Sequence, residues 1–401
     1  MFKTFQATRK ACYIGYLTQA IVINYIPLLY VTFQTSLGLT LSQISLLIGI
    51  NFGIQMLTDI GSAPLVARIG NRASVVLAHI LCGAGMIALA ILPNILPYTF
   101  PAVILSVVIC SIGGGLIEVM VSPILEACPS EHKSSQMSLL HSFYCWGQAG
   151  VVLVSTLIFL VAGVERWPYI ACFWGLIPLV NAAFFAMVPI RPLVEEGEGE
   201  SRLALMRRPL FWAMMGLMLS AGACEITMSQ WASTFAEMGL GVSKAVGDLL
   251  GPCMFALFMG ISRILTAILS KRISLYTLIG GSFLLCILSY VITVAAPLPI
   301  LSLLGCGLCG LSVGAMWPGT YSIASEKIPR GGFPLFALLA CGGDIGCTLG
   351  PTLAGQVASH WGGDLKIAFT VAILYPLFGF LVILGLRLRR KSAEKAPETH
   401  D

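Results

Sequence analysis

Long apolar segments recur along the 401 residues of the chain, and short breaks rich in polar residues, proline or glycine separate them. Each segment reaches the ~20 residues that an α-helix needs to cross a bilayer core. The chain lacks the regular alternation of apolar and polar positions that is typical of membrane β-barrels. The pattern therefore predicts twelve transmembrane helices, at residues 11–33, 42–66, 74–93, 99–127, 137–162, 168–190, 210–236, 247–269, 275–296, 299–325, 333–359 and 366–387.

The composition agrees with this pattern. Hydrophobic residues make up 57% of the chain and charged residues only 10%, and the mean hydropathy is +0.90. A soluble domain carries about a quarter charged residues, so lipid must solvate most of this surface. The predicted fold class is an all-α membrane protein. The segment 11–33 exceeds the ~7–15 apolar residues of a signal peptide, which predicts a retained first helix.

The thirteen cysteines do not indicate a disulfide framework. Nearly all of them fall within the apolar segments, where cysteine behaves as a small hydrophobe. Cys306 and Cys309 form a C-x-x-C pattern, but Gly and Leu flank them in a helix core, which favours packing over a redox or metal site. Histidines and acids do not recur at metal-ligand spacings. We expect no metal and no cofactor.

The charges predict how the helices are oriented. If the N-terminus is cytoplasmic, most of the 23 Lys and Arg residues fall on cytoplasmic helix ends and loops, as the positive-inside rule requires. This placement also accounts for the net charge of +5 without a nucleic-acid partner. We predict a multi-pass protein of the cell membrane with both termini in the cytoplasm.

The longest connection, "RPLVEEGEGESRLALMRRP" at 191–209, is polar and acidic in its middle. It divides the chain into six plus six helices. The predicted domains are an N-terminal bundle at 1–190, a cytoplasmic linker at 191–209, a C-terminal bundle at 210–390 and a cytoplasmic tail at 391–401.

The two halves are similar to each other. "PAVILSVVICSIGGGLIEVM" (101–120) matches "PLPILSLLGCGLCGLSVGAM" (297–316) at several positions, and the same offset relates Cys145 to Cys341 and Gly150 to Gly346. Repeated six-helix halves of parallel topology, with solute held between them at mid-membrane, are typical of secondary transporters. Chance matching of apolar sequences is the alternative, and the unchanged offset over two helices argues against it.

Twelve helices, a central linker and duplicated halves resemble the major facilitator superfamily. Two stretches are similar to its fucose–proton symporter branch: "GGGLIEVMVSPILEACPSEHKSSQMSLLHSFYCWGQAG" (113–150), and "GACEITMSQWASTF" (222–235) with the later "GISRIL" (260–265). The resemblance implies two six-helix bundles around a central solute site, and a monomer by analogy. The chain departs from the pattern at Ala67, where the superfamily's loop carries Asp, and at Ser122, where the branch carries Asn. Its first helix offers Gln19 and Asn24 but no acid.

Glu118 lies in mid-helix, where a charged side chain costs roughly 2.5–3.5 kcal/mol to insert. Ser111, Gly114, Gly115 and Ser122 share its helix face, which leaves room for water. Glu118 is therefore predicted to carry a coupling proton; a structural pair or a permanently neutral Glu is the alternative.

Glu225 is the second predicted coupling carboxylate, because it lies near the middle of the seventh helix. Other polar or aromatic side chains on the same faces are predicted to bind the solute: Asn24, Gln19, Ser122, Gln148, Ser229, Gln230, Trp231 and Asp344. For Trp231 the alternative is an interfacial belt residue.

Four further charged residues are predicted to gate the path or to support the structure, namely Asp59, Arg68, Arg72 and Arg263. For Arg263, which keeps its proton and needs a partner, snorkelling toward the cytoplasm is the alternative. His141 opens the fifth helix, where a helix-start hydrogen bond is expected rather than a proton relay.

These features predict a secondary transporter that imports a sugar or another small polar solute with protons by alternating access. The alternative is a proton-driven exporter of drugs or metabolites with the same fold. The chain carries no Walker-type loop and no catalytic set, so neither ATP-driven pumping nor an enzyme is expected. The expected partners are a small solute, protons and the lipid bilayer.

Overall fold

A computed structural model describes residues 4–129, 133–191, 202–270 and 272–395. The predicted linker at 191–209 falls largely outside the described residues, as does the end of the predicted tail. Their boundaries therefore stay predictions, as does the place of the domain division.

The described chain is helical throughout, and no strand occurs among its residues. In the first half the elements are α1 (Phe5–Asn24), η1 (Ile26–Leu29), α2 (Tyr30–Leu37), α3 (Leu41–Ile69), α4 (Asn71–Ile95), α5 (Thr99–Glu126), α6 (Lys133–Ala162), η2 (Val164–Arg166) and α7 (Trp167–Met187). In the second half they are α8 (Arg202–Met206), α9 (Pro209–Thr234), η3 (Phe235–Gly239), α10 (Lys244–Asp248), η4 (Leu249–Cys253), α11 (Met254–Leu269), α12 (Leu275–Ala295), α13 (Pro299–Val313), α14 (Met316–Lys327), α15 (Gly332–His360), α16 (Leu365–Ala372) and α17 (Leu374–Lys395).

Twelve spans in the described part of the chain are long and apolar enough to cross a membrane, which confirms the predicted fold class. The first span runs from Phe5 to Leu37, beyond the predicted 11–33 at both ends. At its start the Thr4 side chain accepts a hydrogen bond from the backbone of Ala7 and caps the helix. The helix therefore extends into a polar stretch that hydrophobicity alone does not reveal.

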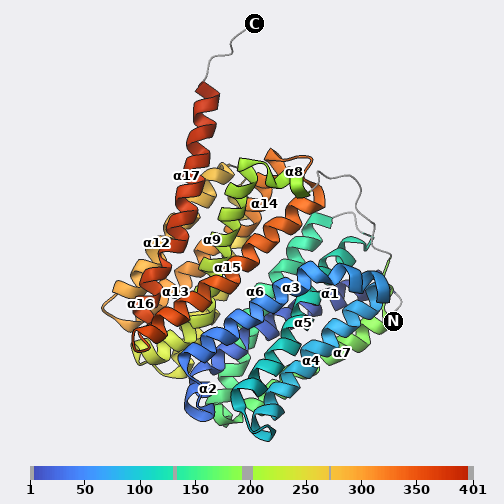
Figure 1. The fold of residues 1–401 in the computed structure, drawn as a ribbon, viewed down its shortest axis with the longest axis vertical. Coiled ribbons are helices and arrows are strands. Elements are labelled where there is room, and N and C mark those ends of the chain that lie inside the picture. The colour runs from blue at the N-terminus through green and yellow to red at the C-terminus, as the bar shows by residue number, and fades with distance from the viewer. Residues whose placement is uncertain (1–3, 130–132, 192–201, 271, 396–401) are drawn as a thin grey trace.

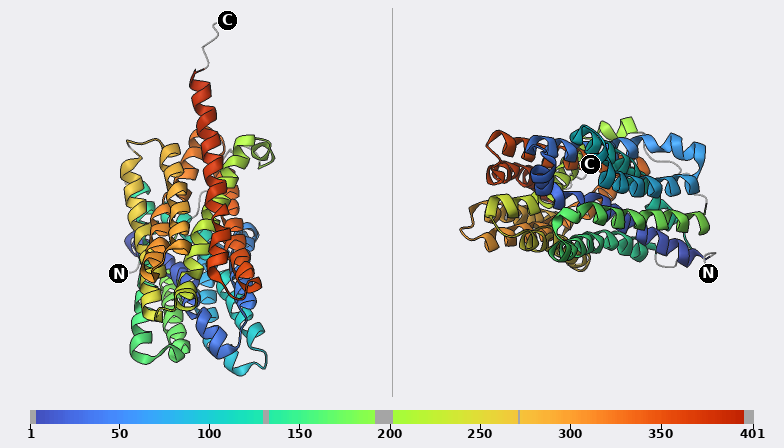
Figure 2. Two further views of the ribbon diagram at one scale, coloured as in Figure 1. Left: turned by 90° about the vertical axis from the view of Figure 1, so that its left-hand side faces the viewer. Right: turned by 90° about the horizontal axis from the view of Figure 1, so that it is seen from below.

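The helices gather into two bundles that lie side by side, blue to green for the first half and yellow to red for the second (Figures 1 and 2). In the first bundle α4 packs on α5 and α7, and α1 packs on α5 and α6. In the second, α9 packs on α15 and α17, and α12 packs on α13. The bundles meet chiefly where α3 contacts α15 and where α6 contacts α11.

The two ends of the molecule are named here after their short helices. The α2 end holds the connections α2–α3 and η3–α10. The α8 end holds α8, the start of α1 and the connection α3–α4 (Figure 1). By the predicted orientation the α8 end faces the cytoplasm.

Direct contacts between the bundles run along α3 and α15 from the α2 end toward the middle. Ser42 Oγ donates to Gln356 Oε1 at 3.0 Å, and Ser45 Oγ donates to the Thr352 carbonyl at 2.6 Å. Deeper in the membrane a Cβ on Gly49 would lie 2.7 Å from Thr352 Oγ1. The α2 end is therefore closed by close packing and side-chain hydrogen bonds.

The first membrane-crossing helix is broken at Pro27, where η1 separates α1 from α2. Proline has no N–H, so the carbonyl four residues earlier, that of Ile23, loses its helical partner. Gln230 of the second bundle fills this vacancy, because its Nε2 donates to the Ile23 carbonyl at 3.2 Å. The break thus turns a backbone group of one bundle into a contact with the other.

Glycines set the distance between α9 and α15. A Cβ on Gly346 would lie 2.0 Å from the Leu219 carbonyl oxygen and 2.8 Å from the Ala223 nitrogen, both backbone atoms that cannot turn away. Gly150, its counterpart in the internal repeat, has no atom within 4 Å of such a Cβ. The equivalent position is therefore constrained in one bundle and open in the other.

We expect Gly346→Ala to destabilise the protein by about 1–3 kcal/mol, since overpacking against backbone forces α9 and α15 apart. Gly150→Ala is the matched control, and its stability should stay within about 0.5 kcal/mol of the parent. Thermal unfolding of the purified variants in detergent measures both. Equal midpoints for the two variants would contradict the packing argument.

Candidate functional site

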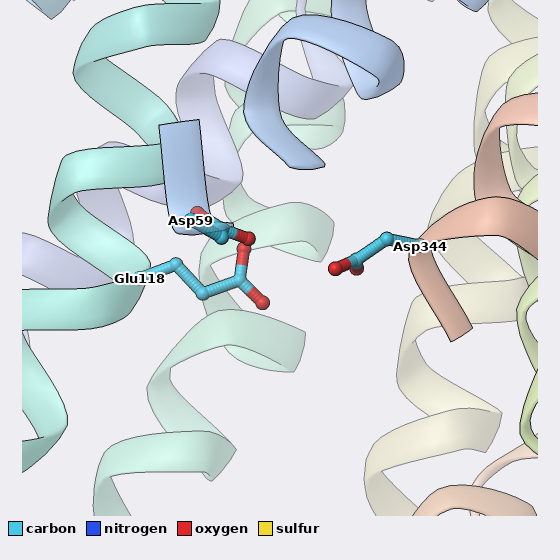
Figure 3. Close-up of side chains that lie close together, drawn as sticks. All are labelled: Asp59, Glu118 and Asp344. Atoms are coloured by element: carbon cyan, nitrogen blue, oxygen red, sulfur yellow. The ribbon is translucent and has the colours of Figure 1, made fainter. Parts of the chain in front are cut away.

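Three carboxylates meet between the bundles near the middle of the membrane. Asp59 of α3 and Glu118 of α5 come from the first bundle, and Asp344 of α15 comes from the second (Figure 3). One carboxylate oxygen from each lies within 4.8 Å of the others. Glu118 is exposed to solvent, whereas Asp59 and Asp344 are half-buried. The cluster therefore lies at a place that water reaches.

Small residues on α5 make room for this cluster. A Cβ on Gly115 would lie 2.9 Å from Asp59 Oδ1, and one on Gly114 would lie 3.3 Å from Gln19 Oε1. Both glycines share the helix face of Glu118, as the sequence predicts. That face packs against α1 and α3, so polar side chains of these two helices lie directly against the α5 backbone.

An amide pair holds one side of the Glu118 carboxylate. Gln19 Nε2 donates to Glu118 Oε2 at 3.3 Å and to Gln55 Oε1 at 3.0 Å. Both glutamines are at least 95% buried. Gln19 Oε1 and Asp59 Oδ1 have no hydrogen-bond partner among the described residues. Gln55 Nε2 also lacks a partner among these residues, so both acceptors and a donor are left unpaired around Glu118.

The charges of the cluster are not balanced by nearby basic residues. No Lys or Arg of the described chain forms an ion pair with Asp59, Glu118 or Asp344. Two like charges 4.8 Å apart repel by about 3–4 kcal/mol at an effective dielectric constant of 20. Within the described residues, this is also the set of His, Cys, Asp and Glu side chains close enough to share a metal ion. Spacing along the chain did not predict it, because each residue comes from a different helix.

Glu225, the second predicted coupling residue, lies apart from this cluster. It is 8% exposed on α9, in the same bundle as Arg263. Arg263 donates from Nη1 to the His141 carbonyl of α6 at 3.1 Å, which joins the two bundles. Arg263 therefore has a carbonyl partner in the first bundle.

Ser122 lies one turn from Glu118 on α5, and its hydroxyl is 2.7 Å from the Tyr16 hydroxyl of α1. The rings of Tyr16 and His141 are nearly perpendicular, with their centroids 5.2 Å apart. Ser122, Tyr16 and His141 thus continue the polar lining from Glu118 toward the α8 end.

The remaining predicted solute residues are buried. Asn24 and Ser229 donate to carbonyls of their own helices, those of Ala20 and Ile226. Gln148 is 1% exposed.

Gln230 and Trp231 are also enclosed, in the packing of the α2 end. Gln230 accepts from the Tyr30 hydroxyl at 2.9 Å. Trp231 is completely buried and donates from Nε1 to the Pro351 carbonyl at 2.9 Å. The interfacial-belt alternative for Trp231 is therefore wrong.

The predicted charges at the α3–α4 connection have different surroundings. Arg72 donates from Nη1 to the carbonyls of Phe185, Ala186 and Val188 at 2.8–3.0 Å. It thereby satisfies the carbonyls that the end of α7 leaves free, a structural role within the first bundle. Arg68 is exposed.

Three residues with polar contacts between helices were not predicted from the sequence. Gln55 and Tyr16 gave no signal, because an amide or a phenol within an apolar helix is common. Lys244 was also missed, although its spacing of four residues from Asp248 indicates an ion pair on a helix. Lys244 Nζ indeed lies 3.2 Å from Asp248 Oδ2.

Comparison with known proteins identifies the class of this fold. The chain matches the family model of the Major Facilitator Superfamily over residues 12–333. It therefore belongs to the Major Facilitator Superfamily, whose members are multi-pass membrane transporters. No curated protein matches it in sequence.

Solved transporter structures share the fold at low sequence identity. A mutant of the nucleoside transporter NupG superposes with a TM-score of 0.76 at 13% identity, covering 95% of this chain and 99% of that one. A bacterial homologue of the human lysosomal transporter Spinster, in an inward-facing and occupied conformation, gives 0.73 at 15%, covering 95% and 94%. A D-xylose–proton symporter gives 0.70 at 16%, covering 94% and 95%. Family and fold thus indicate a transporter rather than an enzyme.

Removing one charge from the carboxylate cluster should stabilise the conformation described here. We expect Asp344→Asn to raise the midpoint of thermal unfolding at pH 8.5 by roughly 2–6 °C, because it relieves repulsion from Asp59 and Glu118. Glu326→Gln, an exposed acid paired with Lys327, is the control and should not raise it. A lower midpoint for Asp344→Asn would show that the cluster is not under repulsion.

Proposed function

We propose that this protein is a secondary transporter that imports a sugar or another small polar solute together with protons, by alternating access. The observation that carries the proposal is the carboxylate cluster of Asp59, Glu118 and Asp344, which draws acids from both bundles to within 4.8 Å. The sequence resemblance to the fucose–proton symporter branch supports the same solute class.

The cluster gives a physical reason for coupling. Because Asp344 belongs to one bundle and Asp59 and Glu118 to the other, rocking of the bundles changes the distance between like charges. Bringing the three together without counter-ions costs several kcal/mol, and a proton on one of them removes most of that cost. Protonation and the closed arrangement of α3 with α15 therefore favour each other, and the coupling is reciprocal.

Glu118 is the carboxylate best placed to exchange the proton. It is the exposed member of the three, and Gln19 holds it by one hydrogen bond from a neutral amide. Glu225 is instead buried on α9 and lies apart from the cluster. We therefore propose Glu118, with Asp59 and Asp344, as the coupling site, and we assign no coupling role to Glu225.

The solute is proposed to bind beside this site. Gln19, Ser122 and Asp344 offer hydroxyl and carboxylate or amide groups, which suit the hydroxyls of a sugar or polyol. Gln230 and Trp231 lie in the closed α2 end, so they would face the solute only when that end opens. The proposed orientation places both termini in the cytoplasm, and the chain divides into bundles at 1–190 and 210–390 that work as a monomer in the cell membrane.

Uphill uptake into proteoliposomes tests the coupling residue. With one proton per solute, a gradient of one pH unit supports about tenfold accumulation. We expect Glu118→Gln to abolish this accumulation while solute exchange across the membrane continues, since exchange needs no net proton movement.

Glu165→Gln, an exposed acid of η2, is the control for loss of charge and should accumulate solute normally. Accumulation that survives in Glu118→Gln removes Glu118 from the coupling role. Efflux driven by the same gradient would establish the exporter instead. The solute itself can be found by a thermal-shift screen of monosaccharides, polyols, amino acids and lipophilic cations, because a ligand stabilises the state that binds it.

A further inference from the structure

A lysine at the α2 end joins the two bundles. Lys244 of α10 donates from Nζ to the carbonyl oxygen of Leu28 in η1. The same nitrogen lies 3.3 Å from Glu237 Oε1 and 3.2 Å from Asp248 Oδ2, and 5.5 Å from the centre of the Phe159 ring of α6. One ammonium group thus contacts two acids of its own bundle together with a carbonyl and an aromatic face of the other.

A backbone carbonyl of the first bundle is available for this contact. Leu28 lies in the short 3-10 segment η1, directly after Pro27. Carbonyls at such a break lack a full set of helical partners, and a cation is a favourable partner for them because of their partial negative charge. The break that offers the Ile23 carbonyl to Gln230 therefore offers the Leu28 carbonyl to Lys244.

Asp248 adds a second contact with α6 of the first bundle. This carboxylate is completely buried and accepts hydrogen bonds from Thr156 of α6 at 3.1 Å and from Ser233 of α9 at 2.5 Å. A buried carboxylate is stable only while its charge is paired. Lys244 is the cation that pairs it, so the acid, the lysine and both bundles depend on one another.

We propose that Lys244 is a latch that holds the α2 end of the transport path closed. The latch consists of Lys244 and Asp248 in the second bundle, and of Leu28, Thr156 and Phe159 in the first. Opening of this end separates Lys244 from Leu28 and Phe159 while it stays with Glu237 and Asp248. The two acids thus keep the ammonium neutralised in both states, and only its contacts with the first bundle are made and broken.

This role differs from a structural ion pair within one bundle. Lys244 and Asp248 are four residues apart on one short helix and would pair without any contribution from the first bundle. The additional bonds to Leu28, Phe159 and Thr156 form only when the bundles meet at this end. Removing the lysine should therefore change the opening of the α2 end more than the stability of either bundle.

Hydrogen exchange followed by mass spectrometry on the purified full chain, without solute, tests the latch. We expect Lys244→Ala to speed exchange in the segments 26–37 and 235–248 by about tenfold, because local opening becomes easier. Segments of α4 and α7, which pack within the first bundle, should exchange as in the parent. The measurement requires no solute or proton gradient, so its outcome is independent of the proposed transport function.

Lys366→Ala is the matched control. Lys366 is the second residue of α16 in the second bundle, which packs on α12 and α15. Its removal changes the net charge by the same amount. Thr156→Val and Phe159→Leu weaken the latch from the first bundle and leave the Lys244–Asp248 pair intact. They keep the test valid should Lys244→Ala fail to fold.

Faster exchange at both segments in the latch variants, with Lys366→Ala unchanged, supports the latch. Three results would each overturn it: rates at the two segments within about twofold of the parent, an equal acceleration in Lys366→Ala, or a uniform acceleration that includes α4 and α7. The last of these would mean that Lys244 stabilises the whole protein rather than one end of it.

Discussion

A carboxylate in the hydrocarbon core must find water, a counter-charge or a proton, and this protein is organised around that requirement. Asp59, Glu118 and Asp344 have no basic partner in the described chain, and they meet where the two bundles face each other. Their mutual repulsion at 4.8 Å is comparable to the cost of burying any one of them. The position of the bundles and the charge state of these acids therefore cannot vary independently.

The fold could be predicted from the sequence almost completely, and the site only in part. Twelve apolar segments define twelve helices, because in lipid every backbone hydrogen bond has to be satisfied within a helix. Glu118 was identified because a lone acid within an apolar segment is costly to insert into the membrane. Its association with Asp59 and Asp344 could not be foreseen, since it depends on how α3, α5 and α15 are packed. Gln55 was missed for the same reason, because its hydrogen bond to Gln19 joins two different helices.

Glycine and proline have different structural roles in the two bundles, although the halves are related by an internal repeat. Gly346 brings α9 against the α15 backbone, whereas its counterpart Gly150 is in open space. Pro27 breaks the first helix and exposes carbonyls that the second bundle uses through Gln230 and Lys244. The repeat thus sets the architecture, and departures from it place the contacts that join the halves. Similarity between the halves is a guide to topology but not to the site.

The two polar regions between the bundles are built on opposite principles. At mid-membrane, like charges face each other and solvent reaches them. A proton on one carboxylate therefore stabilises their close contact, and without a proton their repulsion opposes it. At the α2 end, Lys244 lies between the opposite charges of Glu237 and Asp248, so that contact is favourable in the absence of any ligand. An arrangement of this kind biases the empty protein toward closure at the α2 end and leaves the cluster accessible from the α8 end. Binding of a proton or a solute at the cluster then determines whether the protein can open at the α2 end and close at the α8 end.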